Sequence, residues 1–390
     1  MKKLLIILLL LTLTGCWNYQ ELNTIAIATA IGIDKNDEKK YEVSIMIANS
    51  KKEQSGSKES ESQSVIFTGV GDTISEAFKD IDLYNPRRNY IGHVAVVVIS
   101  EEVAKDGLND ILDFFARNPE STKRFQMVIA KDNKAKDILK ILTPLETFSA
   151  QNISNNLKYS RDSQATSTSI LYSDFIYVLL EKGINPILPN VILKGNEKSG
   201  SEDKSLQQTI PDAFIKINNL AIFDDYKLVG FANANESRGI NLLKNTIEQL
   251  TVNIKIDNKY IAFKLLNSTT KNKINFKNKP YINVEIKGTA TLVEDNSNHS
   301  LTDEKIINEI EKKINKKIEE LAKKGLEVAK KYKTDIFGYG NLIYKNYPNY
   351  FEKFKDWDKD GFNELDITIK SNVVLSTTGS AKTTLKGVKQ

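Results

Sequence analysis

The sequence VAVVVI at residues 94–99, followed by EEVAKDGLNDILDFFAR at residues 101–117 and FQMVIA at residues 125–130, predicts a strand, a helix and a second strand. A further helix is expected at residues 134–142, because apolar residues again recur at helical spacing. Strands that alternate with helices build βα units over a sheet. The first half of the chain is therefore predicted to contain such a sheet.

Toward the N-terminus, residues 25–33 and 41–48 are rich in β-branched residues and are separated by a polar turn, which predicts a hairpin. Residues 49–64 are polar apart from glycine, so we expect an exposed, mobile loop there. A strand at 65–70 and a helix that begins near Asp72 as its N-cap follow.

Toward the C-terminus, helices are expected within residues 148–180, and the polar stretch 195–209 is the best candidate for a linker. Beyond it we expect strands at 213–223, 252–265, 281–293 and 364–375, and helices at 237–248 and 303–333. The prediction is an α+β chain of two to three domains with mixed sheets and packed helices. Its parts are residues 1–15 as a signal peptide, 16–194 as an N-terminal α/β region that allows a further division near 145, the linker 195–209, and 210–390 as a C-terminal α+β domain.

The longest predicted helix carries one apolar stripe at steps of three and four residues, formed by Ile307, Ile310, Ile314, Ile318, Leu321, Val328 and Tyr332, with Gly325 in the remaining slot. Acidic residues open this helix and lysines close it, which suits the helix dipole. Because acids interleave with the other lysines, we expect a solvated face rather than a lipid-binding one.

The N-terminus is typical of a secretion signal, with Lys2 and Lys3 before an apolar run that is too short to span a membrane. The run ends in Leu13-Thr14-Gly15-Cys16, which resembles the bacterial lipobox. We therefore expect cleavage before Cys16 and lipidation of its thiol, so that the chain is a lipoprotein anchored at the outer face of a membrane.

Composition excludes several function classes. Cys16 is the only cysteine and there are two histidines, so the residues for a His/Cys zinc site or a Cys/His nucleophile pair are missing. Without Lys2 and Lys3 the formal charge falls from +5 to +3, which gives no reason to propose a nucleic-acid partner. No Walker loop, nucleophile elbow or dinucleotide fingerprint is present. We predict no catalytic, cofactor-binding or metal-binding residue.

One stretch, Asp356-Trp357-Asp358-Lys359-Asp360-Gly361, has the spacing of a calcium loop. The twelfth position is Ile367, where a bidentate glutamate would be needed. An acidic turn is the favoured interpretation, and calcium binding by Asp356, Asp358 and Asp360 is left open.

Several strings, in order along the chain, resemble those of the Ger(x)C lipoprotein family, the C subunits of nutrient germinant receptors of spore-forming bacteria. They are GCWNYQELN at 15–23, GID at 32–34, GHV at 92–94, DFFAR at 113–117, AIFDDYKLVGF at 221–231, ESRGIN at 236–241 and DIFGYG at 335–340. Asn18 departs from the aspartate usual in the family.

The resemblance implies a non-enzymatic subunit needed for nutrient-triggered spore germination. It would lie on the outer face of the spore inner membrane, beside a polytopic A subunit and a transporter-like B subunit. Structure is the default role of these strings, since ESRGIN suggests a loop that opens a helix. Glu236 and Arg238 are nevertheless candidate interaction residues, because arginine favours partly buried ion pairs at interfaces.

Two other functions stay open. A solute-binding lipoprotein that captures a small nutrient would require two similar lobes around a cleft, and the two halves differ in the order of their elements. A lipid-anchored hydrolase that uses only carboxylates would require a pocket of acids with perturbed pKa values.

Overall fold

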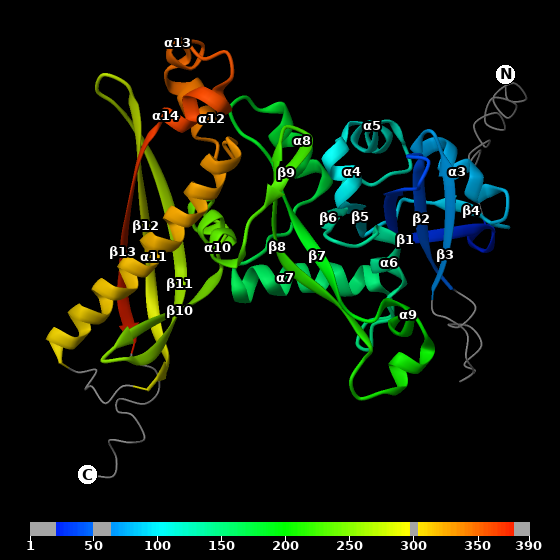
Figure 1. The fold of residues 1–390 in the computed structure, drawn as a ribbon, viewed down its shortest axis with the longest axis horizontal. Coiled ribbons are helices and arrows are strands. Elements are labelled where there is room, and N and C mark those ends of the chain that lie inside the picture. Colours follow the sequence, from blue (N-terminus) through cyan, green and yellow to red (C-terminus); the bar gives the residue numbers. More distant parts are fainter. Residues whose placement is uncertain (1–20, 50–63, 297–302, 378–390) are drawn as a thin grey trace, which may run out of the picture.

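The computed structural model describes residues 21–49, 64–296 and 303–377, which form two sheets with helices packed on them (Figure 1). The predicted α+β class, with several domains and mixed sheets, is confirmed. The predicted signal peptide and the predicted loop at 49–64 lie almost wholly outside the described residues.

The first sheet has nine strands in the order β3-β2-β1-β5-β6-β7-β8-β9, with β4 beside the start of β1. Its centre, β1-β5-β6-β7, is parallel, and β2, β3, β8 and β9 extend it in antiparallel pairs. The predicted hairpin is confirmed as β1 and β2. The strands are β1 (Ile25–Lys35), β2 (Tyr41–Ala48), β3 (Ser64–Gly71), β4 (Arg88–Tyr90), β5 (Val96–Ser100), β6 (Gln126–Ala130), β7 (Ile187–Gly195), β8 (Ala213–Asp224) and β9 (Lys227–Phe231).

Helices cover both faces of this sheet, because its central strands are apolar on both sides. One face packs against α3 (Ile74–Asp82), α4 (Glu101–Asp106), α5 (Asn109–Arg117) and α8 (Tyr172–Leu180). The other face packs against α6 (Ala135–Lys140) and α7 (Ser149–Gln164). A short 3-10 turn, η1 (Leu22–Thr24), precedes β1.

Two helix predictions need correction. The N-cap of α3 is Thr73 rather than Asp72, since the Thr73 side chain accepts from the backbone N–H of Glu76. The predicted helix 101–117 is two helices, because Gly107 adopts φ 129°, a conformation that glycine tolerates and that ends α4.

The predicted linker 195–209 contains α9 (Glu197–Gly200) and η2 (Asp203–Gln207). The strands on either side of it, β7 and β8, pair antiparallel in the same sheet. Strand pairing therefore carries the first sheet beyond the linker to Phe231. The division of the chain at this linker stays a prediction.

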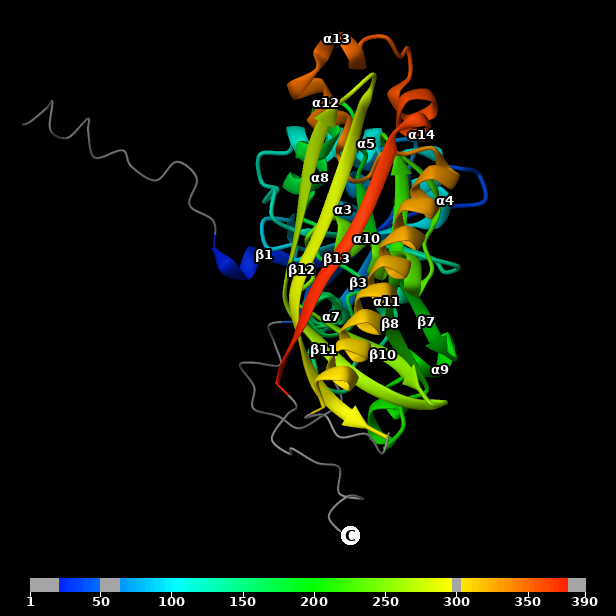
Figure 2. The same ribbon diagram turned by 90° about the vertical axis from the view of Figure 1, so that its left-hand side faces the viewer.

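The second sheet has four strands in the order β10-β11-β12-β13. Its inner face packs against α10 (Ala234–Leu243) and the long helix α11 (Glu304–Tyr332), and its outer face is turned away from both helices (Figure 2). The strands are β10 (Gln249–Ile256), β11 (Lys259–Phe276), β12 (Pro280–Asp295) and β13 (Asp366–Thr377).

The apolar stripe predicted on α11 is confirmed, since Ile310, Ile314, Ile318, Leu321 and Val328 are all buried against this sheet. Polar side chains of α11 also cap the free edge of β13. Asn315 bonds both backbone groups of Val373, and Glu319 accepts from the backbone N–H of Ser371. These bonds close an edge that could otherwise pair with another chain.

A small aromatic lobe lies between α11 and β13. It consists of α12 (Tyr339–Asn346), α13 (Pro348–Phe351), the π-helical turn η3 (Trp357–Gly361) and α14 (Phe362–Glu364). The Trp357 ring stacks on Phe351 at 5.0 Å and meets Phe354 edge-on at 5.6 Å. The lobe continues the core of the second sheet.

Candidate functional site

Helix α10 joins the two sheets and contains the ESRGIN string. It crosses α11 with backbone against backbone: a Cβ on Gly239 would lie 2.0 Å from the carbonyl oxygen of Leu321, and one on Gly325 would lie 2.4 Å from the carbonyl carbon of Gly239. No side chain fits at either position without moving a helix. Both glycines are therefore required by helix packing.

The predicted loop at Glu236 is wrong, because α10 begins at Ala234 and Glu236 lies in its first turn. The Glu236 carboxylate accepts from the backbone N–H of Asn233 at 2.7 Å, and the Asn233 side chain accepts from the N–H of Glu236 at 3.1 Å. This reciprocal arrangement is a capping box. Glu236 thus has a local structural role in starting the helix.

The other polar residues of ESRGIN bond to the first sheet and its helices. Arg238 Nε donates to the carbonyl of Gln164 at 3.3 Å, at the last residue of α7. The buried Asn241 amide donates to two carbonyls in the segment after α7, at 2.9 and 3.0 Å. Ser237 Oγ accepts from the backbone N–H of Leu220 in β8. The string therefore fixes how the second sheet sits on the first.

A second link between the sheets is centred on Asp335 of the DIFGYG string, which is fully buried. Its carboxylate accepts from four consecutive backbone N–H groups, those of residues 337–340, at 2.6–3.2 Å, and from Trp357 Nε1 at 3.1 Å. One side chain thus organises the turn into α12 and holds the indole of the aromatic lobe.

Asp358 ties this cluster to the first sheet. Its Oδ1 accepts from the backbone N–H of Asp335 at 2.7 Å and from the Asn185 amide at 2.8 Å. Asn185, just before β7, accepts in turn from the backbone N–H of Asp225 in the β8–β9 turn. We call Asn185, Asp335 and Asp358 the buried acid junction.

Burial changes the charges of this junction. Desolvation raises the pKa of Asp358 to about 7, and the nearby carboxylate of Asp335 adds to the rise. Burial also raises the pKa of Asp335, against the hydrogen bonds that lower it. Lys244, at the end of α10, donates to the carbonyl of Ile336, and burial lowers its pKa to about 8. The junction is therefore sensitive to pH near neutrality.

Asp358→Asn is expected to change the pH dependence of stability. Because the folded state raises the pKa of Asp358 above its unfolded value, the group favours folding at low pH, and this contribution is lost as pH rises from about 4 to about 7. Asparagine keeps the accepting oxygen without the charge.

The variant should therefore gain about 1–2 kcal/mol relative to wild type between pH 5 and pH 8, measured by urea unfolding at each pH. Asp360→Asn, at an exposed acid two residues away, is the matched control. A constant difference between Asp358→Asn and wild type across this range would contradict the assignment.

The calcium-like spacing does not bring its three carboxylates to one point. Asp356 caps η3 by accepting from the backbone N–H of Lys359 and also pairs with the Lys359 ammonium, whereas Asp358 bonds within the junction. Within residues 21–49, 64–296 and 303–377 there is no group of three His, Cys, Asp or Glu side chains placed to hold a metal ion.

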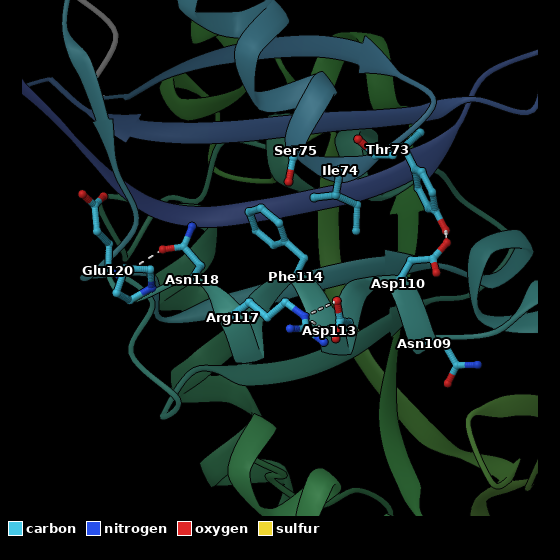
Figure 3. A pocket seen from close by; sticks show the side chains of 12 residues that line it. Thr73, Ile74, Ser75, Asn109, Asp110, Asp113, Phe114, Arg117, Asn118 and Glu120 are labelled. Atoms are coloured by element: carbon cyan, nitrogen blue, oxygen red, sulfur yellow. Dashed lines mark hydrogen bonds and ion pairs between the residues drawn. The ribbon is translucent and has the colours of Figure 1, made fainter.

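An open groove of about 880 Å³ lies between α3 and α5 (Figure 3). Phe114 of the DFFAR string points into it toward α3, and its ring stacks on Phe78 at 5.2 Å. The charged groups around the groove are already paired: Tyr41 donates to Asp110, and Arg117 binds both oxygens of Asp113. No charged side chain here is held ready for a solute, which disfavours small-molecule capture.

A second hollow of about 540 Å³ lies at the carboxyl ends of β1, β5 and β6, the edge where open α/β sheets commonly bind ligands. Here the buried Asp34 of the GID string accepts from the backbone N–H groups of Ala135 and Lys136, at 2.7 and 2.9 Å. Its carboxylate fills the anion position at the start of α6, and desolvation raises its pKa to about 6. Sequence reasoning gave Asp34 and Asp335 no separate role.

Cys16 lies outside the described residues, so its predicted lipidation stays a prediction. None of the helices in the described part of the chain is long and apolar enough to cross a membrane.

The candidate interaction residues Glu236 and Arg238 lie on one helix, and both are half-buried.

Both halves of the chain match known protein families. Residues 18–193 match a family described as the spore germination protein N-terminal domain, and residues 218–379 match one described as spore germination B3/GerAC like, C-terminal. The two matched regions leave a gap, residues 194–217, that contains the whole of the predicted linker 195–209.

Individual proteins match over nearly the full length. Spore germination protein KC of Bacillus subtilis is 30% identical over 99% of this chain and 98% of its own length. Spore germination protein B3 of the same organism is 25% identical over 92% of each chain. The crystal structure of the GerBC protein covers 88% of this chain and 96% of its own, with a TM-score of 0.53 and 20% identity, which supports the fold.

Proposed function

This chain belongs to the spore germination B3/GerAC-like family, and from that premise we propose that it is the lipid-anchored C subunit of a spore nutrient germinant receptor. A role in spore germination follows from the family. The proposal adds the anchor at Cys16, assembly with membrane A and B subunits, and a position on the outer face of the spore inner membrane.

The observation that carries the proposal is where the family-like strings lie in the fold. ESRGIN and DIFGYG supply the polar contacts that join the two sheets, and GID caps α6. In an enzyme, such strings would be expected to converge on an open pocket with unpaired reactive groups. Here they support a rigid body that presents surfaces, as a non-catalytic subunit of an assembly requires.

The proposed anchor fits the described body. Residue 21 is five residues after Cys16, so the lipid would hold the first sheet close to the bilayer. A lipoprotein cysteine carries at least two acyl chains, which is enough for stable anchoring. Tethering would raise the effective concentration of this chain beside the A and B subunits.

Glu236 and Arg238 remain candidate partner contacts. Each is half-buried and so keeps part of its surface open to a neighbour. Their local bonds would hold them in place for such a contact, since Arg238 also donates to Asn235 within α10. A partner carboxylate would then meet an arginine that is already ordered.

Cys16→Ala tests the anchor. With its native leader in a sporulating host, the variant is expected to leave the spore membrane fraction, because the acylated thiol is lost. Immunoblots of washed membranes measure retention, and copurification with the A and B subunits measures assembly. Thr12→Ala, outside the Leu13–Cys16 motif, is the matched control and should stay bound. Undiminished retention of Cys16→Ala in the membrane would contradict the proposed lipid anchor.

A further inference from the structure

The outer face of the four-stranded sheet is an unpartnered surface. Side chains alternate along its strands, so that Val252, Phe263 and Val284 are buried against α10 and α11 while their neighbours point outward. Figure 2 shows β11, β12 and β13 in front, with α11 behind and beside them. No other described element packs on this outer side.

Lysine dominates the charge of this surface. Strand register brings Lys271 opposite Glu285, and Glu285 opposite Lys370, so one acid is flanked by two lysines. On the next outward row, Lys287 lies between Thr269 and Asn372. We call the following set the lysine face: Lys255, Lys264, Lys271, Lys273, Lys287 and Lys370, with Glu285, Glu294 and Asp366 as its acids.

Four lysines of this face have neither an ion pair nor a cation–π contact among the described residues: Lys264, Lys271, Lys273 and Lys370. The Lys255 ammonium lies 4.6 Å from the centre of the Tyr260 ring. Among the described residues, Lys287 is the only member of the six with a carboxylate within 4.0 Å, namely Glu285 at 3.0 Å. Asp366 pairs instead with Lys279, in the turn between β11 and β12. Like charges gathered on one sheet face lower stability. An anionic partner would remove that cost.

The composition of the lysine face suggests what kind of partner it fits. It has no arginine, and threonine and asparagine are the most frequent residues between its lysines, such as Thr251, Asn283 and Thr368. Its exposed large hydrophobic side chains include Tyr260 and Val374. Protein–protein interface cores are depleted of lysine and enriched in arginine and aromatics. Flexible point charges among hydroxyl and amide groups suit a hydrated polymer with repeating acidic groups better than another folded protein.

The position of the lysine face makes the membrane that holds the proposed lipid anchor a poor candidate for its binding partner. The described chain begins at the end of the molecule formed by β1–β3 and α3, and the lysine face lies at the opposite end and points away from it (Figures 1 and 2). This step rests on the proposed lipid anchor, whereas the charge pattern does not. With Cys16 in the membrane, the face would look outward from it.

We propose that the lysine face binds an anionic glycan polymer of the cell wall, whose peptide carboxylates repeat along an extended chain. Neighbouring strands are about 4.8 Å apart and alternate residues along a strand are about 6.8 Å apart, so a single polymer segment reaches several lysines at once. The binding is electrostatic and weakens as salt is added. The face would then hold the subunit between the membrane and the wall.

The test uses the whole mature chain with Cys16→Ala, which carries no lipid, and purified cell-wall sacculi stripped of other polymers. We expect the chain to sediment with sacculi at low salt and to be released by added salt. The triple variant Lys271→Glu, Lys287→Glu, Lys370→Glu should bind at least about tenfold more weakly. The matched control, Lys312→Glu, Lys316→Glu, Lys323→Glu, makes the same charge change at exposed positions of α11 and should bind as before.

A second triple variant changes Lys271, Lys287 and Lys370 to glutamine, which removes the three positive charges without adding negative ones. Thermal unfolding of every variant checks that it is folded. Failure of the parent chain to bind sacculi, an equal loss in the α11 control, or tighter binding to vesicles containing phosphatidylglycerol than to sacculi would each overturn the proposal. None of these readouts depends on germination. The lysine face and the receptor-subunit role can therefore fail separately.

Discussion

Asp335→Ala is expected to lower the free energy of unfolding by about 4 kcal/mol. The change removes the acceptor of four backbone N–H groups and of Trp357 Nε1 in a fully buried site. Alanine leaves these donors unsatisfied, and each one costs free energy where water cannot reach it. Part of the loss is offset because the buried charge disappears as well.

The measurement is urea unfolding of the mature chain with Cys16→Ala, followed by tryptophan fluorescence, because Trp357 reports on the same cluster. Asp335→Asn keeps one accepting oxygen and should lose less. Asp360→Ala removes an exposed carboxylate of the same lobe and should be nearly neutral. A loss below about 1 kcal/mol for Asp335→Ala would show that the carboxylate does not organise this turn.

Gly239→Ala is expected to cost about 3 kcal/mol or more, because the added methyl group collides with the Leu321 carbonyl of α11. At an exposed helix position the same change would instead stabilise by up to about 1 kcal/mol, so the sign itself is informative. Since α10 also bonds to the first sheet, the strain should loosen the link between the sheets. Limited proteolysis near residues 165–171, beside the Asn241 contacts, would detect that loosening.

Lys324→Ala, at the exposed residue next to Gly325, is the control for this contact and should change stability by less than about 0.5 kcal/mol. Gly239→Ala and Gly325→Ala disturb the same crossing. Their combined cost should therefore be smaller than the sum of the two single costs. Full additivity would mean that the two glycines act independently, contrary to the packing described for α10 and α11.

Much of the fold could be predicted because local patterns were strong. The apolar stripe on α11 and the β-branched strands of the β1–β2 hairpin repeat at the spacing of their elements, so burial follows from sequence order. The errors came from single residues. Gly107 divides a helix through its positive φ, and Asn233 starts α10 three residues earlier than expected through its capping box with Glu236.

The sites were less predictable, because their contacts join residues far apart in the sequence. Asp34 caps a helix about a hundred residues later, and Asp358 bonds to Asn185, just before β7 of the first sheet. The sequence does show that Asp34 lies at the end of a buried strand and that Asp335 lies just before a glycine-rich turn. Nothing local showed which groups they would meet. The lysine face was hidden similarly, since its residues come from separate strands.

The most direct test of the central claim is the rate of nutrient-triggered germination in spores that lack this chain, in a host from which other members of the family have been removed. The response to mixed nutrients is expected to fall to the level seen without nutrient, while a nutrient-independent trigger still works. The wild-type chain is expected to restore the response. Full nutrient germination in the absence of the chain would contradict the proposed role as a receptor subunit.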